Sequence, residues 1–272
     1  MDSTRMTYFT KKIIRKVRQC VGQYDSPKGL MILMYHRVNP DLPDHNLVTR
    51  PEMFARQMRF LTTKKHVYDF VSLKDFEQQP AQFIDKPGPK TKIIITFDDG
   101  YRDNFLYAYP VLRRWSIPAT IFLTTHLINT EKKFKRYEAV SGRDMLNQKE
   151  IQQMAATRIT FGAHTCKHVH LPRLPVEQQR AEVLDSLHAL ETLVPPGGRV
   201  KTFCYPYGEY STDTIRVVRQ AGCPCALTVQ VGVNQSDTPP LELKRVEISG
   251  MDDLKSFEFK VLEKFINTKS IK

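Results

Sequence analysis

The sequence predicts an α/β fold in which parallel strands and helices share one large core. Strand-length apolar segments alternate with helix-length amphipathic segments from about residue 30 to residue 250, a pattern typical of a mostly parallel sheet. The chain has 272 residues, 41% hydrophobic and 26% charged, and this composition excludes disordered, collagen-like and disulfide-scaffold proteins. The number of strands favours a closed barrel, and an open doubly wound sheet is the alternative.

The expected strands are short and apolar, as strands buried on both faces are. The first, residues 30–34, is apolar at every position, and residues 93–97 begin with three isoleucines. In chain order, the expected strands cover residues 30–34, 66–73, 93–97, 119–123, 160–163, 200–205, 226–229 and 243–248.

The segments between these strands carry apolar residues at helical spacing. Residues 51–61 open with a proline, a frequent first residue of helices, and the long segment 176–194 stops before two prolines and a glycine. Residues 126–147 show no period and are expected to form a surface excursion near the site. The expected helices cover residues 51–61, part of 101–115 with a break near Pro110, 148–156, 176–194 and 212–221.

The N-terminal residues 1–27 form a separate element, and residues 28–272 form one domain. Between Thr7 and Tyr24, apolar residues recur at steps of three and four, and basic residues occupy mostly the other side. This predicts a basic amphipathic helix. Three roles are open for it: packing on the domain, lying on an anionic membrane, or contacting nucleic acid.

The net charge of the chain favours some classes of binding partner but does not choose among them. Lys and Arg number 41 against 29 Asp and Glu, a net charge of +12, which favours acidic partners such as nucleic acid, anionic lipid or phosphorylated glycans. Because no recognition motif for nucleic acid is present, we expect none to be bound. The five cysteines are odd in number and scattered, which indicates reduced thiols rather than a disulfide framework or a zinc ribbon.

The sequence contains no run of about 18 apolar residues that would span a bilayer. Its first residues lack the apolar region and small-residue cleavage site of a signal peptide. We therefore expect a cytoplasmic chain, with residues 7–24 as a point of peripheral contact with the inner membrane.

Polar clusters follow three of the expected strands, where parallel strands place catalytic groups. The first is Thr-Phe-Asp-Asp-Gly at residues 96–100. Because adjacent carboxylates such as Asp98 and Asp99 repel each other, a bound metal would relieve the conflict. The alternative for an isolated Asp-Asp-Gly is an ordinary turn.

The second cluster is His-Thr-Cys-Lys-His at residues 164–168. If this segment is helical, His164 and His168 lie on one face and both can reach one metal. By itself this spacing is common in surface histidines. Together with a carboxylate from another strand it gives two His and one carboxylate, the set of catalytic metal sites with open positions. The other histidines match no such pattern and are interpreted as surface or packing residues: His45, His66, His126, His170 and His188.

The third cluster is Tyr-Pro-Tyr-Gly at residues 205–208. Such a turn is either a rigid connection or a wall of a sugar pocket that presents backbone N–H groups to an oxyanion. We expect Tyr205 and Tyr207 to be exposed, because exposed aromatic rings suit stacking on a pyranose.

Together these motifs resemble the polysaccharide deacetylase family, the NodB-homology carbohydrate esterases of family 4. Thr-Phe-Asp-Asp-Gly, His-Thr-x-x-His followed by Leu171, and Tyr-Pro-Tyr-Gly stand in family order, and Ile-Pro-Ala-Thr-Ile-Phe-Leu at residues 117–123 is similar to the family strand after the first motif. The similarity covers roughly residues 30–250. It implies a distorted (β/α) barrel of about seven parallel strands that forms a single catalytic domain.

The resemblance also implies an activity, the metal-dependent removal of N-acetyl groups from an amino-sugar glycan or glycan precursor. In such enzymes the first Asp is the general base, here Asp98. The implied metal ligands are Asp99, His164 and His168, with zinc as the expected ion. Two alternatives are a catalytically inactive glycan-binding protein of this fold and a deformylase of a lipid-linked amino sugar.

The same resemblance implies how the substrate is held. The substrate and its oxyanion would lie beside Tyr205, Pro206 and Tyr207. Thr165 would support the metal ligands through its hydroxyl. The substrate would be an N-acetylated cell-envelope glycan, or a nucleotide- or lipid-linked sugar, which fits the basic chain better.

The sequence departs from the family in two places. Many members have an Arg at the start of the third motif and a late His as general acid, whereas here the motif begins with Phe203 and no His follows Gly208. His36 is the candidate acid, since Tyr-His at this place resembles the circularly permuted poly-N-acetylglucosamine deacetylases; a buried structural His is the alternative. Arg245 is the candidate partner that holds Asp98 ionised, and Arg37 is its competitor.

Overall fold

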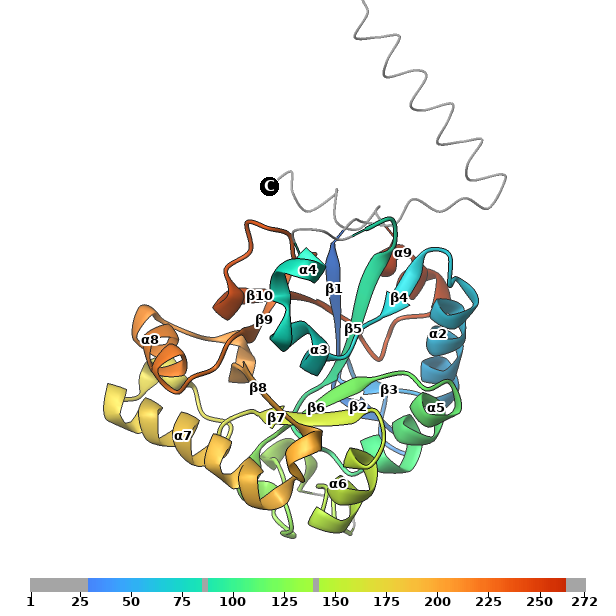
Figure 1. Cartoon of the computed structure of the whole chain (residues 1–272). Helices are drawn as coiled ribbons and strands as arrows, with labels where there is room; N and C mark the ends of the chain where they lie inside the picture. The colour runs from blue at the N-terminus through green and yellow to red at the C-terminus, as the bar shows by residue number, and fades with distance from the viewer. Residues whose placement is uncertain (1–28, 85–87, 139–141, 263–272) are drawn as a thin grey trace, which may run out of the picture.

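The computed structural model describes residues 29–84, 88–138 and 142–262, which form a barrel of parallel strands with helices outside it (Figure 1). Neighbouring strands around the barrel are β1, β10, β9, β8, β7, β6 and β5, and β5 closes the ring by pairing with β1. The strand bounds are Leu30–Tyr35 (β1), Thr91–Phe97 (β5), Ala119–Leu123 (β6), Ile159–Ala163 (β7), Arg199–Cys204 (β8), Ala226–Val231 (β9) and Leu243–Glu247 (β10). The predicted barrel of about seven parallel strands is therefore confirmed, whereas the helix expected over residues 7–24 lies outside the described residues.

The barrel is distorted because two strands share one edge of β5. The short strand β4 (Tyr68–Phe70) pairs with the first half of β5, from Thr91 to Ile93, and β6 pairs with its second half. The strand expected over residues 66–73 was too long. It ends early because Ser72 caps a helix, its side chain accepting a hydrogen bond from the N–H of Asp75.

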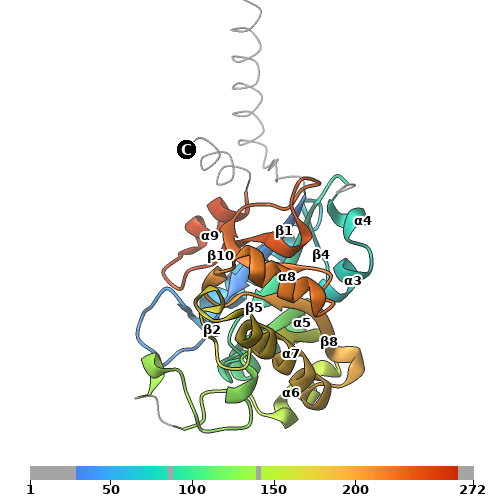
Figure 2. The same cartoon turned by 90° about the vertical axis from the view of Figure 1, so that its left-hand side faces the viewer.

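Helices cover the outside of the barrel: α7 packs against β7 and β8, and α8 lies beside α7 (Figure 2). Three of them, α3, α4 and α9, were not predicted, because helices of five to eight residues show barely two turns of apolar period. The bounds are Pro51–Thr63 (α2), Leu73–Gln78 (α3), Pro80–Ile84 (α4), Tyr109–Arg114 (α5), Gln148–Ala155 (α6), Val176–Leu193 (α7), Thr212–Gln220 (α8) and Leu254–Val261 (α9). No helix among the described residues is long and apolar enough to cross a membrane.

The break expected near Pro110 is absent. The backbone passes through Pro110 as the first turn of α5, and a π-helical turn, Asn104–Ala108, precedes it. Proline lacks an N–H donor and its ring crowds the carbonyl four residues earlier, and the wider π turn accommodates both defects.

A fully buried core fixes the end of the barrel where the chemistry-bearing residues lie. All six residues of β1 are buried, and the Tyr35 ring packs edge-on against Phe54 of α2 at 5.2 Å and stacks on Phe97 of β5 at 5.5 Å. Tyr35 and Phe97 immediately precede His36 and Asp98. Packing of this core therefore positions both candidate residues.

A small two-stranded sheet lies beside this end of the barrel. β2 (Arg37–Val38) follows His36 directly and pairs with β3 (Val48–Thr49), which leads into α2. The segment after His36 is thus fixed by main-chain hydrogen bonds.

Candidate active site

The carboxyl ends of five strands gather the residues that the sequence singled out. His36 follows β1, Asp98 and Asp99 follow β5, and His164 follows β7. Arg245 and Cys204 belong to β10 and β8. All of these side chains except His36 are buried, and His36 is 17% exposed.

Asp99, His164 and His168 form a candidate metal centre. The Nε2 atoms of His168 and His164 lie 3.2 and 3.6 Å from Oδ1 of Asp99. Among the residues that the structure describes, this Oδ1 is buried and has no hydrogen-bond partner. Burial opposes ionisation of Asp99, but the adjacent His168 outweighs it and holds the pKa of Asp99 well below its usual range. One carboxylate oxygen and two imidazole nitrogens therefore lie close together. This set of donor atoms fits a divalent metal such as zinc.

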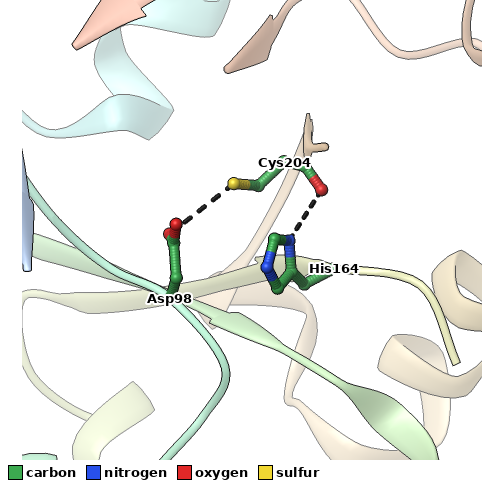
Figure 3. A group of neighbouring side chains, drawn as sticks. All are labelled: Asp98, His164 and Cys204. Carbon is green, nitrogen blue, oxygen red and sulfur yellow. Dashed lines mark hydrogen bonds between the residues drawn. The ribbon is translucent and has the colours of Figure 1, made fainter. Parts of the chain in front are cut away.

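His164 is prepared to act as a ligand. Its Nδ1 lies 2.7 Å from the carbonyl oxygen of Cys204 (Figure 3). Since a carbonyl only accepts, Nδ1 carries the proton and the lone pair of Nε2 faces Asp99. Burial, reinforced by His168, lowers the pKa of His164 to about 4, so the imidazole is neutral at physiological pH. A neutral imidazole is the form that binds metals.

The segment between the two histidines is a loop rather than a helix, and the loop conformation brings both imidazoles to Asp99. Thr165 and His168 adopt left-handed backbone angles, with φ of 60° and 56°, as do Asp99 at 75° and Tyr207 at 59°. These are four of the six described non-glycine residues with positive φ. Each such conformation costs about 1–3 kcal/mol and tends to cluster at functional sites. The Thr165 hydroxyl supports the loop by accepting the N–H of His168 at 2.9 Å.

Asp98 has different partners from its neighbour Asp99. Arg245 donates to both of its oxygens, Nη1 to Oδ1 and Nη2 to Oδ2, each at 2.8 Å. Burial alone would raise the pKa of Asp98, but the guanidinium outweighs it and lowers the pKa to about 2. His36 Nε2 lies 4.0 Å from Oδ2 of Asp98. The structure thus contains the Arg245–Asp98 ion pair that the sequence suggested, with His36 beside it.

The competitor Arg37 turns away from Asp98. Its guanidinium bonds to Asp103, with Nε 2.6 Å from Oδ2, and to Asp144. It also lies over the rings of Tyr101 and Tyr137, at 4.2 and 4.3 Å from their centroids. Arg37 therefore ties the strand after His36 to the segment after Asp99 and to the surface excursion.

Cys204 lies close to Asp98 as well. Its thiol is 3.5 Å from Oδ1, and Asp98, His164 and Cys204 form a second group with metal-binding atoms (Figure 3). Arg245 already holds both oxygens of Asp98, and burial raises the pKa of the Cys204 thiol well above its usual value. Because a metal binds thiolate rather than thiol, the Asp99 group is the better metal centre.

The third motif exposes one aromatic ring rather than two. The prediction that Tyr205 is exposed was wrong: its ring packs against Tyr210 at 5.0 Å, and its hydroxyl donates to the carbonyl of Leu241. Tyr205 directly follows β8, and its side chain lies in the core. Pro206 is also buried, whereas Tyr207 is 45% exposed.

Sequence reasoning missed two residues at this centre. His170, interpreted as a surface or packing residue, stacks on the Tyr207 ring at 3.9 Å and hydrogen-bonds Glu209 through Nδ1. Arg136 donates to Oδ2 of Asp99 and to the Tyr101 hydroxyl, both at 2.8 Å. No local sequence pattern identifies either residue, because each reaches the centre through the path of an irregular segment. For Arg136, the available signal was the expectation that residues 126–147 lie near the site.

Comparisons with known proteins agree with this geometry. A family model described as polysaccharide deacetylase matches residues 85–226. The Bacillus subtilis protein YxkH is 27% identical over 225 residues, covering 83% of this chain and 73% of its own. A poly-beta-1,6-N-acetyl-D-glucosamine N-deacetylase of Staphylococcus aureus is 25% identical over 255 residues, covering 83% of both chains.

Solved structures share the fold. The Streptococcus pyogenes deacetylase PplD in complex with acetate superposes with a TM-score of 0.71 at 23% identity, covering 87% of this chain and 99% of that one. IcaB from Ammonifex degensii gives 0.69 at 23% identity, covering 86% and 96%. At these identities the superpositions establish the barrel architecture.

The Arg37 contacts predict a large loss of stability on substitution. In Arg37→Met, Asp103 and Asp144 stay buried without a cation, which should lower the free energy of unfolding by about 3–5 kcal/mol. Urea unfolding of the variant measures this loss. Arg56→Met, on the exposed face of α2, is the control and should change stability by no more than about 0.5 kcal/mol.

A second variant separates the charge effect from lost packing. Adding Asp103→Asn and Asp144→Asn to Arg37→Met removes both uncompensated charges and should recover part of the loss. An unfolding midpoint for Arg37→Met equal to that of the wild type would contradict the assignment.

Proposed function

The chain belongs to the polysaccharide deacetylase family, and from this we propose that it is a metal-dependent hydrolase that removes N-acetyl groups from an amino-sugar glycan or glycan precursor. One observation carries the proposal. Adjacent buried carboxylates have opposite settings: Arg245 binds both oxygens of Asp98, whereas Oδ1 of Asp99 faces two imidazole nitrogens and has no hydrogen-bond partner among the described residues. This is the division of labour expected of a general base beside a metal ligand.

The proposed metal is a divalent ion, with zinc the first candidate. Asp99 Oδ1 and the Nε2 atoms of His164 and His168 would hold it. A metal in such a site supplies Lewis acidity, which polarises a carbonyl and lowers the pKa of water.

The other residues move or position protons. Asp98, kept ionised by Arg245, would accept the proton of the attacking water. His36, on the solvent side of Asp98 and partly exposed, would donate a proton to the leaving amine. The exposed Tyr207 ring would stack on the sugar, with its main-chain N–H group beside the oxyanion.

The substrate class is supported by the named relatives. The Staphylococcus aureus protein is named for poly-beta-1,6-N-acetyl-D-glucosamine, and PplD was solved with acetate. We therefore propose an N-acetylated amino-sugar polymer as the first substrate class for this chain. A lipid-linked amino sugar, carrying an acetyl or a formyl group, is the second.

The sequence of residues 7–24 adds a proposal about location. Its basic amphipathic pattern suits peripheral contact with anionic lipid on the cytoplasmic side of the membrane.

Removing the proposed base should abolish turnover without removing the metal. We expect acetate release from N-acetylglucosamine oligomers or lipid-linked amino sugars to need added zinc after chelation. Asp98→Asn should lower the rate by about 10²- to 10⁴-fold while still binding the metal, and Asp99→Asn should lose metal binding. Acetate and formate release, with a parallel metal titration, measure both effects. Metal binding without release of either acid from any substrate would favour the inactive glycan-binding alternative.

Arg245 should set the acid limb of the activity profile. Because the guanidinium lowers the pKa of Asp98 to about 2, Arg245→Met should raise that pKa to or above the usual value near 4. The acid limb of kcat/KM against pH should then move to higher pH, because a buried Asp98 without its cation becomes harder to ionise. Arg245→Lys, which keeps the charge, should shift it less, and an unmoved limb in Arg245→Met would refute the role.

Membrane contact is tested by flotation with anionic vesicles. The full chain should float with vesicles that contain phosphatidylglycerol and remain below neutral ones, and a chain lacking residues 1–24 should float with neither. Equal soluble fractions of the two chains would remove this part of the proposal.

A further inference from the structure

The loop between the two candidate histidine ligands has a strained backbone. Thr165 and His168 both have φ near 60°, a region that residues other than glycine adopt rarely. Such conformations persist only where the surroundings fix them. The contacts of this loop therefore bear on the direction in which His164 and His168 point.

One side of the loop is held by the segment after β6. The N–H groups of Thr125 and His126 donate to the carbonyl oxygens of Thr165 and Cys166, at 3.2 and 3.0 Å. Within the loop, the N–H of His168 donates to the Thr165 hydroxyl. These bonds satisfy two carbonyl groups and one N–H group of the loop.

The other side is held by a carboxylate on α7. The N–H groups of Cys166 and Lys167 both donate to Oε2 of Glu182, at 2.9 and 3.1 Å. Two consecutive N–H groups that converge on one anion form a charge-assisted nest. The neighbouring Val183 is fully buried in the core, so α7 presents the carboxylate from a fixed position.

We propose that Glu182 is a positioning residue of the metal centre. Its carboxylate holds residues 165–168 in the conformation in which both imidazoles face Asp99, and so sets the affinity for a divalent metal. Glu182 acts through the two main-chain N–H groups, and its carboxylate is bonded to them rather than directed at Asp99. The inference rests on the proposed function, because it requires that the Asp99 centre binds a metal.

A cavity of about 390 Å³ lies beside this contact, and Cys166, Glu182 and Asp185 are among its lining residues. This cavity is partly lined by polar side chains, so water can enter it and bond the two N–H groups when the Glu182 side chain is shortened. We therefore expect Glu182 variants to fold and to lose the anchor of the loop rather than the barrel.

The test is a metal titration of the metal-free full chain. Cobalt binding is followed by absorption, and zinc binding by competition with a chromophoric chelator. Loss of a group that orients metal ligands typically weakens metal affinity by about 10- to 100-fold, and this is the effect expected for Glu182→Ala. Glu182→Gln should lose less, because its amide oxygen can still accept both N–H groups without the negative charge.

Asp185→Asn is the matched control. Asp185 is exposed, lies one helical turn beyond Glu182 and lines the same cavity. Its substitution removes the same charge from the same region, and should weaken affinity no more than about threefold because exposed charges are screened.

The outcomes separate the inference from the proposed function. Wild-type affinity in Glu182→Ala overturns the inference alone, as does an equal loss in Asp185→Asn, which would show that charge acts at long range. If the metal-free Glu182→Ala protein melts far below the wild type, Glu182→Gln decides instead, and a metal affinity no weaker than that of Asp185→Asn overturns the inference. If the wild type binds metal no better than Asp99→Asn, both the inference and the proposed metal centre fail.

Discussion

Closure of the barrel between β1 and β5 is the constraint on which the rest of the structure depends. Six consecutive residue pairs, from Leu30–Lys92 to Tyr35–Phe97, join the two strands in parallel register. The register continues beyond the strands, since the N–H of Asp98 donates to the carbonyl of Tyr35. It fixes His36 beside Asp98 although 62 positions separate them in the chain. Every other residue of the site reaches the same end because all neighbouring strands of the barrel are parallel.

Asp98 and Asp99 are adjacent and both buried, but their carboxylates have different partners. Asp99 adopts a left-handed backbone conformation, with φ of 75°. Each carboxylate then meets its own cationic or ligand-type partners, Arg245 in one case and Arg136 with two imidazoles in the other. Burying both as anions would be prohibitive without such partners. The strain in the backbone and the ionic pairing are thus parts of one arrangement.

The loops at the site are held by charged groups in fixed elements. Arg37 in β2 clamps the segment after Asp99, and Glu182 in α7 anchors the loop that carries His164 and His168. Arg136 occupies one oxygen of Asp99 and leaves the other facing the imidazoles. These contacts hold the metal-binding atoms of the protein in place before a metal or substrate binds. A loop that is fixed in this way can position catalytic groups precisely.

Apolar periodicity predicted the parallel α/β architecture and the strand bounds 119–123, whereas the family resemblance of the motifs added the seven-stranded barrel and the roles expected of Asp98, Asp99, His164 and His168. Apolar periodicity and spacing are local properties, so they can be read along the chain. Tertiary structure alone decided three features of the site. It pairs Asp98 with Arg245 rather than Arg37, it buries Tyr205, and it brings Arg136 and His170 to the site. Each depends on register and packing between segments far apart in sequence, and no local pattern encodes which side chains meet across the mouth of a closed barrel.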